Sequence, residues 1–220
     1  MKEQKICIVG DGLAGLTAAI ILSKGNIKID LYSSKKKKKI KDNRTTAISE
    51  SNYQYIQKNL NFYNKHFFWP CKKINLFFED KGKIINFFNF KSKNKNLMYI
   101  FQNKDLKKNL DKIILKKKKI KLFKKNIENI NNKEGFITFN KKKIFYDLII
   151  LCTGGRSNFY SMIEEERSIK KDYREIALTT IIKHNAKIVN VSQFFLKEGP
   201  LAILPFQKKA FSTVWSVSNE

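Results

Sequence analysis

Long apolar runs are missing from this sequence. The longest candidate, residues 13–22, is interrupted by Gly15 and Thr17, whereas a membrane-spanning helix needs about 20 mostly apolar residues. We therefore predict no transmembrane segment. The first residues lead directly into the apolar run 6–9 and lack the ordered charged, apolar and small-residue regions of a signal peptide. Both absences predict a cytoplasmic protein.

Cysteine and histidine are also scarce. The three cysteines, Cys7, Cys71 and Cys152, are far apart and lie in apolar surroundings. Such cysteines are typical of reduced, buried thiols rather than of disulfides. His66 and His184 have no neighbours at the spacing of metal ligands. We predict no metal site.

Arginine is scarce although the chain is strongly basic. The net charge is +26, but the only arginines among 45 basic residues are Arg44, Arg156, Arg167 and Arg174. Recognition of bases favours the two-pronged arginine side chain, and no segment resembles a helix-turn-helix, an RNA-recognition motif or a zinc finger. Nucleic acid is therefore not a predicted partner. The lysine runs 35–39 and 116–119 have two interpretations. They are solvated surface segments, or they contact an anionic inner membrane peripherally.

What the chain does contain is apolar sequence in short, patterned segments. Hydrophobic residues make up 42% of 220 residues, enough for one large core or two small ones. Residues 6–9 form a continuous apolar run typical of a buried parallel strand. A glycine-rich turn follows, then helical spacing from Leu13 to Leu22, and a second strand at 28–32. This order predicts the start of a β-α-β unit.

The rest of the chain is predicted from the same patterns. Residues 42–60 predict a loop followed by a helix-like pattern that begins near Ile48, with Ser49 or Ser51 able to cap the first turn. Trp69-Pro70 indicates a break. Residues 73–90 predict a β-hairpin that turns at 80–82. A helix is expected at 103–115, and strands are expected at 119–123, 127–131, 135–140 and 144–151, the last one central because it is almost wholly apolar. An antiparallel sheet is expected from 175–183, 188–196, 201–206 and 211–217.

The segment Gly10-Asp11-Gly12-Leu13-Ala14-Gly15 has a task for each glycine. Gly10 makes a tight turn, Gly12 lets a pyrophosphate approach the backbone, and Gly15 lets the helix pack closely on the strand. The N–H groups at Leu13 and Ala14 open the helix, whose positive dipole end favours phosphate. The segment therefore predicts dinucleotide binding in a Rossmann-like α/β domain. A purely structural glycine turn is the alternative.

An acidic residue that holds the adenosine ribose is expected at the end of the second strand. Counting from Gly15, that position falls at Ser33, and Asp30 lies too early. Ser33 can donate a hydrogen bond to a ribose hydroxyl, but a carboxylate that accepts two such bonds is absent there. The substitution predicts weaker binding of the adenosine.

Two motifs together resemble the flavin hydroxylases of ubiquinone biosynthesis, the UbiH/UbiF type within the group similar to para-hydroxybenzoate hydroxylase. Besides the glycine segment, residues 42–49 (DNRTTAIS) are similar to the family pattern D-x-R-x-x-A-[LI]-S. The resemblance implies that Arg44 faces the flavin. It also implies FAD as the cofactor and NAD(P)H as a candidate electron donor.

Two further segments extend the resemblance. Residues 100–106 (IFQNKDL) are similar to the family segment that opens a helix in contact with FAD, which implies that Gln102 or Asn103 makes the contact. Residues 147–157 (DLIILCTGGRS) are similar to the family pattern D-L-[VI]-[VI]-G-A-D-G-x-x-S. There Thr153 replaces the family's aspartate, while Gly154 and Ser157 are retained. The replacement puts reduction by NAD(P)H in doubt.

The C-terminal segments resemble strands on the substrate side of the flavin. Residues 199–206 (GPLAILPF) and 212–216 (STVWS) are similar to the strands written G-P-L-A-L-L-P-L and L-V-W-[ST]. Relatives continue into a G-D-A-A-H-x-x-x-P-x-x-G-Q-G-x-N stretch that binds the flavin, and the 220 residues do not contain it. We therefore expect weak FAD binding by these residues alone, with a partner chain as one source of the missing part.

The resemblance implies hydroxylation of a polyprenylated aromatic ring by an FAD-dependent monooxygenase. It assigns an FAD-binding domain to 1–71 with 97–160 and a substrate-side sheet to 72–96 with 161–220. No residue is implied as a catalytic acid or base, because the cofactor carries the chemistry. Two alternatives remain: a truncated, inactive or partner-dependent FAD-binding fragment, and a basic module that binds a membrane surface or nucleic acid.

Overall fold

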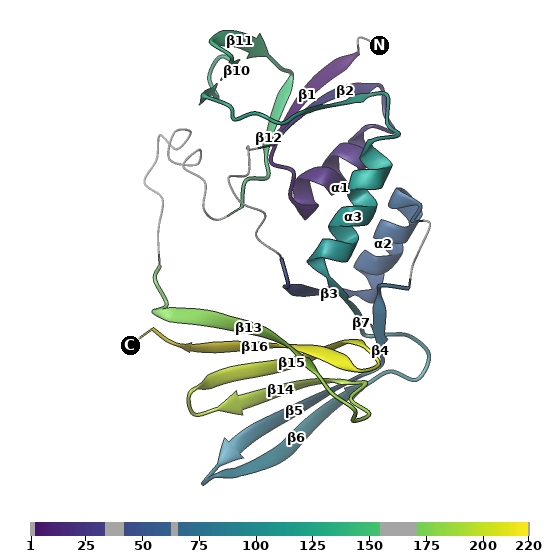
Figure 1. Ribbon diagram of the computed structural model, residues 1–220, viewed down its shortest axis with the longest axis vertical. Helices are drawn as coiled ribbons and strands as arrows, with labels where there is room; N and C mark the ends of the chain where they lie inside the picture. The colour runs from purple at the N-terminus through teal and green to yellow at the C-terminus, as the bar shows by residue number, and fades with distance from the viewer. Residues whose placement is uncertain (1–2, 34–41, 63–65, 155–170, 220) are drawn as a thin grey trace. The chain divides into compact units, whose positions relative to one another are not determined.

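The computed structural model describes residues 3–33, 42–62, 66–154 and 171–219, which fall into two compact units. One unit consists of residues 1–40 with 107–170, and the other of 41–106 with 171–220. The first is built around a parallel sheet with helices, and the second around a larger sheet of mostly antiparallel strands (Figure 1). The predicted α/β fold class, with a parallel sheet and a second antiparallel sheet, is confirmed.

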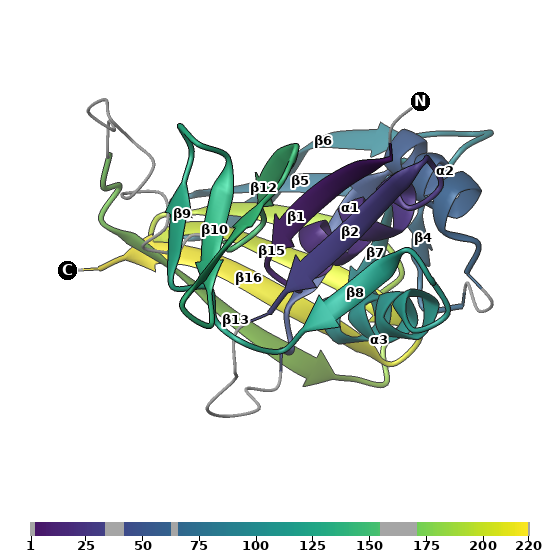
Figure 2. The same ribbon diagram turned by 90° about the horizontal axis from the view of Figure 1, so that it is seen from above.

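The parallel sheet of the first unit has the strand order β12-β1-β2-β8 (Figure 2). Its strands are β1 (Gln4–Val9), β2 (Ile27–Tyr32), β8 (Ile120–Phe123) and β12 (Leu148–Leu151). β1 pairs in parallel with both β12 and β2. The prediction of one central strand at 144–151 was wrong: it divides into β11 (Lys142–Phe145) and β12. Among the described residues β12 is an outer strand.

Strand alternation explains why both faces of this sheet are covered. Ile6, Ile8, Ile29 and Leu31 alternate with Cys7, Val9 and Tyr32, and all seven are buried. The isoleucine and leucine face lies against the helices α1 (Leu13–Leu22) and α3 (Asn103–Ile114) (Figure 1). The opposite face packs on a three-stranded meander of β9 (Asn129–Asn131), β10 (Phe136–Phe139) and β11. A sheet buried on both faces needs near-continuous apolar strands.

The second unit contains a six-stranded sheet in the order β13-β16-β15-β14-β5-β6. Its strands are β5 (Lys73–Asp80), β6 (Lys83–Lys91), β13 (Glu175–Lys183), β14 (Val191–Leu196), β15 (Gly199–Gln207) and β16 (Ala210–Ser218). The predicted hairpin is confirmed as β5 and β6. The expected antiparallel pairing holds for β13 to β16, while β14 runs parallel to β5.

A small sheet packs on this larger one within the second unit. It consists of β3 (Thr45–Ser49), β7 (Met98–Gln102) and β4 (Trp69–Cys71). The sequence had indicated a loop before residue 48 and a break at Trp69-Pro70, but both segments pair with β7. Buried Cys71, Ile100, Val191, Phe206 and Ala210 form the common core. Tertiary pairing has overridden weak local strand signals there.

Helix α2 (Glu50–Leu60) follows β3 directly. Its N-cap is Ser49, whose Oγ accepts a hydrogen bond from the Asn52 N–H at 3.3 Å. Ser49 was one of the two predicted caps. A serine at this position satisfies one of the backbone donors that the first turn of a helix leaves free.

The compact units differ from the predicted domain boundaries. The prediction grouped 1–71 and 97–160 together, whereas 41–71 and 97–106 belong to the unit of the six-stranded sheet. The cause is the packing of β3, β4 and β7 on that sheet, with no charge or composition change to mark it in the sequence. None of the described helices is both long enough and apolar enough to cross a membrane.

Candidate functional site

The glycine turn follows β1 at its carboxyl end. Gly10 has a φ of +117°, and a Cβ there would overlap the carbonyl oxygen of Cys152. The Gly10 N–H donates a hydrogen bond to the Tyr32 carbonyl at 2.8 Å. This backbone conformation and the close approach of Cys152 together require glycine.

The other two glycines of the motif differ sharply from each other. A Cβ on Gly15 would overlap the carbonyl oxygen of Gly10 and lie 3.2 Å from the Cβ of Cys152. A Cβ on Gly12 would meet no atom of the described residues within 4 Å, and the φ of Gly12 is −72°. The fold therefore requires glycine at position 15 but not at position 12. At position 12 the open space lies outside the protein, where a ligand would approach.

The N-terminus of α1 is free of side chains that would compete with a ligand. Gly12 is its N-cap, no side chain accepts from the first turn, and that turn contains no acidic residue. The first helical bond runs from the Leu16 N–H to the Gly12 carbonyl at 3.0 Å. The earlier N–H groups, with the positive end of the helix dipole, form an anion site of the kind that holds a pyrophosphate.

Lys107 is a residue that the sequence did not single out. Its Nζ donates to the carbonyl oxygen of Asp11 at 3.0 Å and lies 3.6 Å from the Asp11 carboxylate. Lys107 also pairs with Asp111 on its own helix, at 3.1 Å. A cation from α3 therefore braces the glycine turn. No sequence signal distinguishes this lysine from its many neighbours.

The carboxyl end of β12 adds two predicted residues to the same unit. The Thr153 Oγ1 is buried and has no hydrogen-bond partner among the described residues. Gly154 has a φ of +72°, and a Cβ there would meet none of the described atoms within 4 Å. An unpaired buried hydroxyl beside a left-handed glycine suits a ligand that supplies the missing partner. Ser157 lies outside the described residues.

The position of Ser33 agrees with the count from the glycine turn. Ser33 is buried directly after β2, and its N–H donates to the Phe123 carbonyl at 2.9 Å. Its Oγ lies 3.5 Å from the same carbonyl, a long contact that leaves the hydroxyl free to bind elsewhere. The role of Ser33 at a ribose stays a prediction.

Asp30 is occupied on the meander face of the sheet. Its Oδ2 accepts from the Tyr146 hydroxyl at 2.7 Å and lies 3.3 Å from the Lys5 Nζ. The Tyr146 and Tyr32 hydroxyls are 2.8 Å apart. Burial raises the pKa of Tyr146 and raises the pKa of Tyr32 to about 12. This neutral phenol pair attaches the meander to the sheet, so Asp30 serves the fold rather than a ribose.

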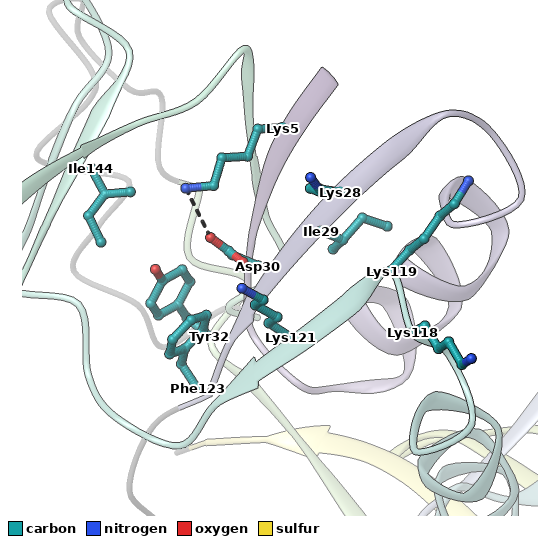
Figure 3. Close-up of a pocket in the computed structure, with 10 residues that line it drawn as sticks. All are labelled: Lys5, Lys28, Ile29, Asp30, Tyr32, Lys118, Lys119, Lys121, Phe123 and Ile144. Atoms are coloured by element: carbon teal, nitrogen blue, oxygen red, sulfur yellow. Dashed lines mark ion pairs between the residues drawn. The ribbon is translucent and has the colours of Figure 1, made fainter. Parts of the chain in front are cut away.

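One cavity of about 350 Å³ opens beside this network (Figure 3). It is lined by Lys5, Lys28, Ile29, Asp30, Tyr32, Lys118, Lys119, Lys121, Phe123 and Ile144. None of the glycine-turn residues 10–15 lines this cavity. The cavity is therefore a different site from the glycine turn.

The second unit holds the other predicted residues in a side-chain cluster. Arg44 Nε donates to Asp42 Oδ1 at 2.9 Å, and its Nη2 donates to Asp42 Oδ2 at 2.8 Å. The hydrogen bonds from Arg44 lower the pKa of Asp42, and the hydrogen bonds to Asp42 raise the pKa of Arg44. The planar guanidinium of Arg44 is thus already hydrogen-bonded to the carboxylate of Asp42, which belongs to the same motif. A phosphate or flavin edge would have to compete with that carboxylate.

Gln102 and Asn103 lie next to this motif because β3 and β7 pair. Thr45 stands opposite Gln102, and the Asn103 N–H donates to the Arg44 carbonyl at 3.0 Å. The Asn103 Oδ1 accepts from the Thr46 hydroxyl at 2.6 Å. Gln102 is buried, with 4% of its surface exposed. The structure thus brings together two motifs that lie more than fifty residues apart; the cofactor contacts of Arg44, Gln102 and Asn103 remain predictions.

Comparison with solved structures supports the same overall architecture. CtdE in complex with FAD and substrate 4 aligns with a TM-score of 0.76 and 16% identity, over 98% of this chain and 57% of that one. PqsL, described as a probable FAD-dependent monooxygenase from Pseudomonas aeruginosa, aligns with a TM-score of 0.76 and 10% identity, over 99% and 61%. At such identities the likeness concerns the fold.

A third structure shows how widely this fold is shared. A geranylgeranyl bacteriochlorophyll reductase-like protein from Thermoplasma acidophilum aligns with a TM-score of 0.69 and 15% identity, over 98% of this chain and 56% of that one. The chain therefore spans less than two thirds of the length of each of these three proteins. No curated protein sequence matches it.

A family model gives the assignment that the solved structures leave open. The model for pyridine nucleotide-disulphide oxidoreductases matches residues 4–191, which is most of the chain. The match includes the glycine turn, the Asp42 motif and the end of β12. This chain belongs to the pyridine nucleotide-disulphide oxidoreductase family.

Proposed function

We propose that this chain supplies the adenosine and pyrophosphate part of an FAD site in a flavin-dependent monooxygenase. The observation that carries the proposal is the N-terminus of α1, which has no side-chain cap and faces open space at Gly12. The unpaired Thr153 hydroxyl supports it. Leu13, Ala14 and Gly154 would present backbone to the cofactor, and Ser33 would bind the ribose.

The cysteines favour a monooxygenase over the disulphide chemistry in the family's name. All three are free. Cys7 alternates to the meander face of the sheet, while Cys152 lies against Gly15 on the helix side, and Cys71 belongs to the other unit. Burial raises the pKa of Cys7 to about 12 and raises the pKa of Cys152. Cys7 and Cys152 are therefore poor nucleophiles, and because they lie on opposite faces of the sheet they do not form an exchanging pair.

The finer proposal is hydroxylation of a polyprenylated aromatic ring in ubiquinone biosynthesis. One atom of O₂ would enter the ring as a hydroxyl group, and the other would leave as water. A hydride from NAD(P)H, which is two electrons and one proton, and one further proton would complete the balance. The bound flavin supplies the oxygen and electron chemistry, and the protein's residues bind and orient it. The similarity of residues 199–206 and 212–216 to substrate-side strands supports this substrate class.

The whole activity would also require the part of the relatives' length that this chain does not span. We propose that a further segment or a partner chain supplies contacts to the flavin ring. The donor is proposed as NAD(P)H, although Thr153 stands where relatives have an aspartate. The chain's own residues would then fix the cofactor's position, and the supplied part would close the ring site.

Gly12→Val tests the cofactor proposal directly. The Cβ of the new side chain meets no atom of the described residues within 4 Å, so folding should be unchanged, while the approach of a pyrophosphate is blocked. FAD titration monitored by flavin fluorescence should show at least about tenfold weaker binding, or about 1.4 kcal/mol. Gly25→Val is the matched control, because its Cβ makes only ordinary contacts at the other end of α1. Equal FAD affinity of parent and Gly12→Val would refute the proposed site.

The substrate class needs a separate assay. The protein, with the missing segment supplied, would be given NAD(P)H, O₂ and either a prenylated phenol or the same phenol without its chain. We expect the prenylated ring to gain one oxygen atom at a clearly higher kcat/KM. Equal turnover of both phenols would remove the polyprenyl preference without affecting the flavin site.

A further inference from the structure

The outer part of the six-stranded sheet carries an exposed aromatic patch. We define this aromatic patch as Ile85, Phe87, Phe88 and Phe90 of β6 together with Phe195 of β14. Each of these side chains is between 40% and 50% exposed. β6 is an edge strand of the sheet (Figure 1), and each of its nine residues is exposed.

The patch residues lie on one face of the sheet. Phe78 pairs with Ile85 on one side and with Phe195 on the other, and paired residues project to the same face. Two residues along β5, Leu76 pairs with Phe88, and after another two Ile74 pairs with Phe90. The register shift after Leu76 leaves Phe87 as an extra residue. Its ring packs near those of Phe78 and Phe195, with centroids 5.6 and 6.1 Å away.

Local packing does not account for these side chains. Phe88 and Phe90 contact each other edge to face, with centroids 4.8 Å apart, but half of each remains in contact with solvent. Contiguous exposed aromatic residues raise the free energy of a protein in water and mark interaction surfaces. The register shift is a β-bulge, which weakens the pairing of a further strand with this edge. The patch therefore suits a partner that contacts the face of the sheet.

The residues around the patch are strongly basic. The segment 72–95 contains seven lysines, namely Lys72, Lys73, Lys81, Lys83, Lys91, Lys93 and Lys95, against Glu79 and Asp80. Lys83 begins β6 on the face of the patch, opposite Asp80, and Lys81 lies in the turn before it. Lys91 ends β6 opposite Lys73 and projects to the other face. The long stems of lysine can lie along an apolar surface while the ammonium groups reach outward. Aromatic rings bordered by lysines at the ends of the hairpin, here called the lysine rim, match the layering of acyl chains beneath lipid headgroups.

We propose that the aromatic patch and its lysine rim bind the surface of a bilayer that contains anionic lipids. The rings enter the boundary between headgroups and acyl chains, and the ammonium groups contact lipid phosphates. Charge complementarity favours this occupant over a second copy of the chain, because two copies of this basic hairpin would repel each other. The inference does not depend on the flavin chemistry, although it would place the enzyme beside a membrane-dissolved substrate.

Sedimentation with lipid vesicles tests the proposal on the 220-residue chain. Vesicles of phosphatidylcholine alone are compared with an equal mixture of phosphatidylcholine and phosphatidylglycerol. We expect binding to the mixed vesicles, and Phe87→Ser/Phe88→Ser should weaken it at least about tenfold, which corresponds to about 1.4 kcal/mol. Lys81→Gln/Lys83→Gln should weaken it about fivefold per lysine. The patch side chains are half exposed, so both variants should keep the parent's unfolding midpoint.

Matched controls lie in the other unit. Leu115 and Phe145 are 81% and 58% exposed, so Leu115→Ser/Phe145→Ser removes as much exposed apolar surface. Lys124→Gln/Lys125→Gln removes the same charge. Both controls should bind vesicles like the parent. The proposal is overturned if the patch variant binds mixed vesicles as tightly as the parent. It is also overturned if the parent self-associates in sedimentation velocity without vesicles and the patch variant loses that self-association but not its vesicle binding.

Discussion

The glycine turn of the first unit and the Asp42 cluster of the second differ in whether backbone or side-chain atoms form them. The turn consists of backbone: Gly10 and Gly15 approach neighbouring carbonyls, and the α1 N-terminus presents N–H groups. The cluster consists of side chains, with Arg44 held by Asp42 and Asn103 held by Thr46. In a chain so rich in lysine, the backbone site tolerates almost any surface change, whereas the cluster depends on particular polar atoms.

The largest expected effect comes from adding a side chain where backbone meets backbone. Gly15→Val would force α1 away from the Gly10 carbonyl and cost about 3 kcal/mol of the free energy of unfolding, since overpacking is relieved only by backbone shifts. Urea unfolding measures this loss. Gly12→Val serves as the contrast, because its urea unfolding midpoint should equal that of the parent. Similar midpoints for Gly15→Val and Gly12→Val would show that the two glycines do not differ as the structure indicates.

Removal of one polar side chain from the cluster should have an intermediate effect. Asn103→Ala leaves the Thr46 hydroxyl without its acceptor, and we expect a loss of about 1 to 2 kcal/mol. Thermal unfolding of Asn103→Ala, Thr46→Val and the double variant forms a cycle. A double variant as destabilised as the sum of the two single ones would mean that their hydrogen bond contributes nothing.

Titration should separate the two regions at opposite ends of the pH scale. Burial raises the pKa of Tyr32 from 10.0 to about 12, so its neutral form is favoured by folding. Its contribution is complete below pH 10.0 and is lost as the pH rises through about 12.

The Asp42 cluster has the opposite sign. Arg44 lowers the pKa of Asp42, so the contribution of that carboxylate is present above its ordinary pKa and is lost as the pH falls through the lowered one. Tyr32→Phe should reduce the alkaline loss of stability and leave the acid loss unchanged, while Asp42→Asn should do the reverse. Unfolding midpoints measured across pH for both variants test the assignment, and identical pH profiles for the two would contradict it.

The smallest effect on stability is expected from Arg44→Lys. The Arg44 side chain is 69% exposed, and exposed ion pairs contribute between about 0 and 1 kcal/mol. A lysine keeps the charge but loses the two-pronged contact. If Arg44 also contacts the cofactor, FAD affinity should fall more than stability does. Unchanged FAD affinity would mean that the Arg44 guanidinium binds Asp42 and does not contact the cofactor.

The sequence by itself determined those features that depend on local chemistry. Apolar periodicity identified β1, α1 and β2, the Asp80-Lys81-Gly82 turn identified the hairpin, and Ser49 capped α2. The glycine spacing indicated which backbone atoms would be crowded, because a turn between a strand and a helix leaves little room for a Cβ. The α/β fold class followed from the order of these elements.

The tertiary structure decided what depends on distant partners. Segments 45–49 and 69–71 became strands because β7 lay beside them, although their own β-signals are weak. The strand predicted at 144–151 divided where Tyr146 turned to bond Asp30. Lys107 was recruited to brace the glycine turn, which its spacing could not reveal. In each case, strand pairing or burial against residues far away in the chain determines the structure. The local sequence pattern does not indicate which residues those partners are.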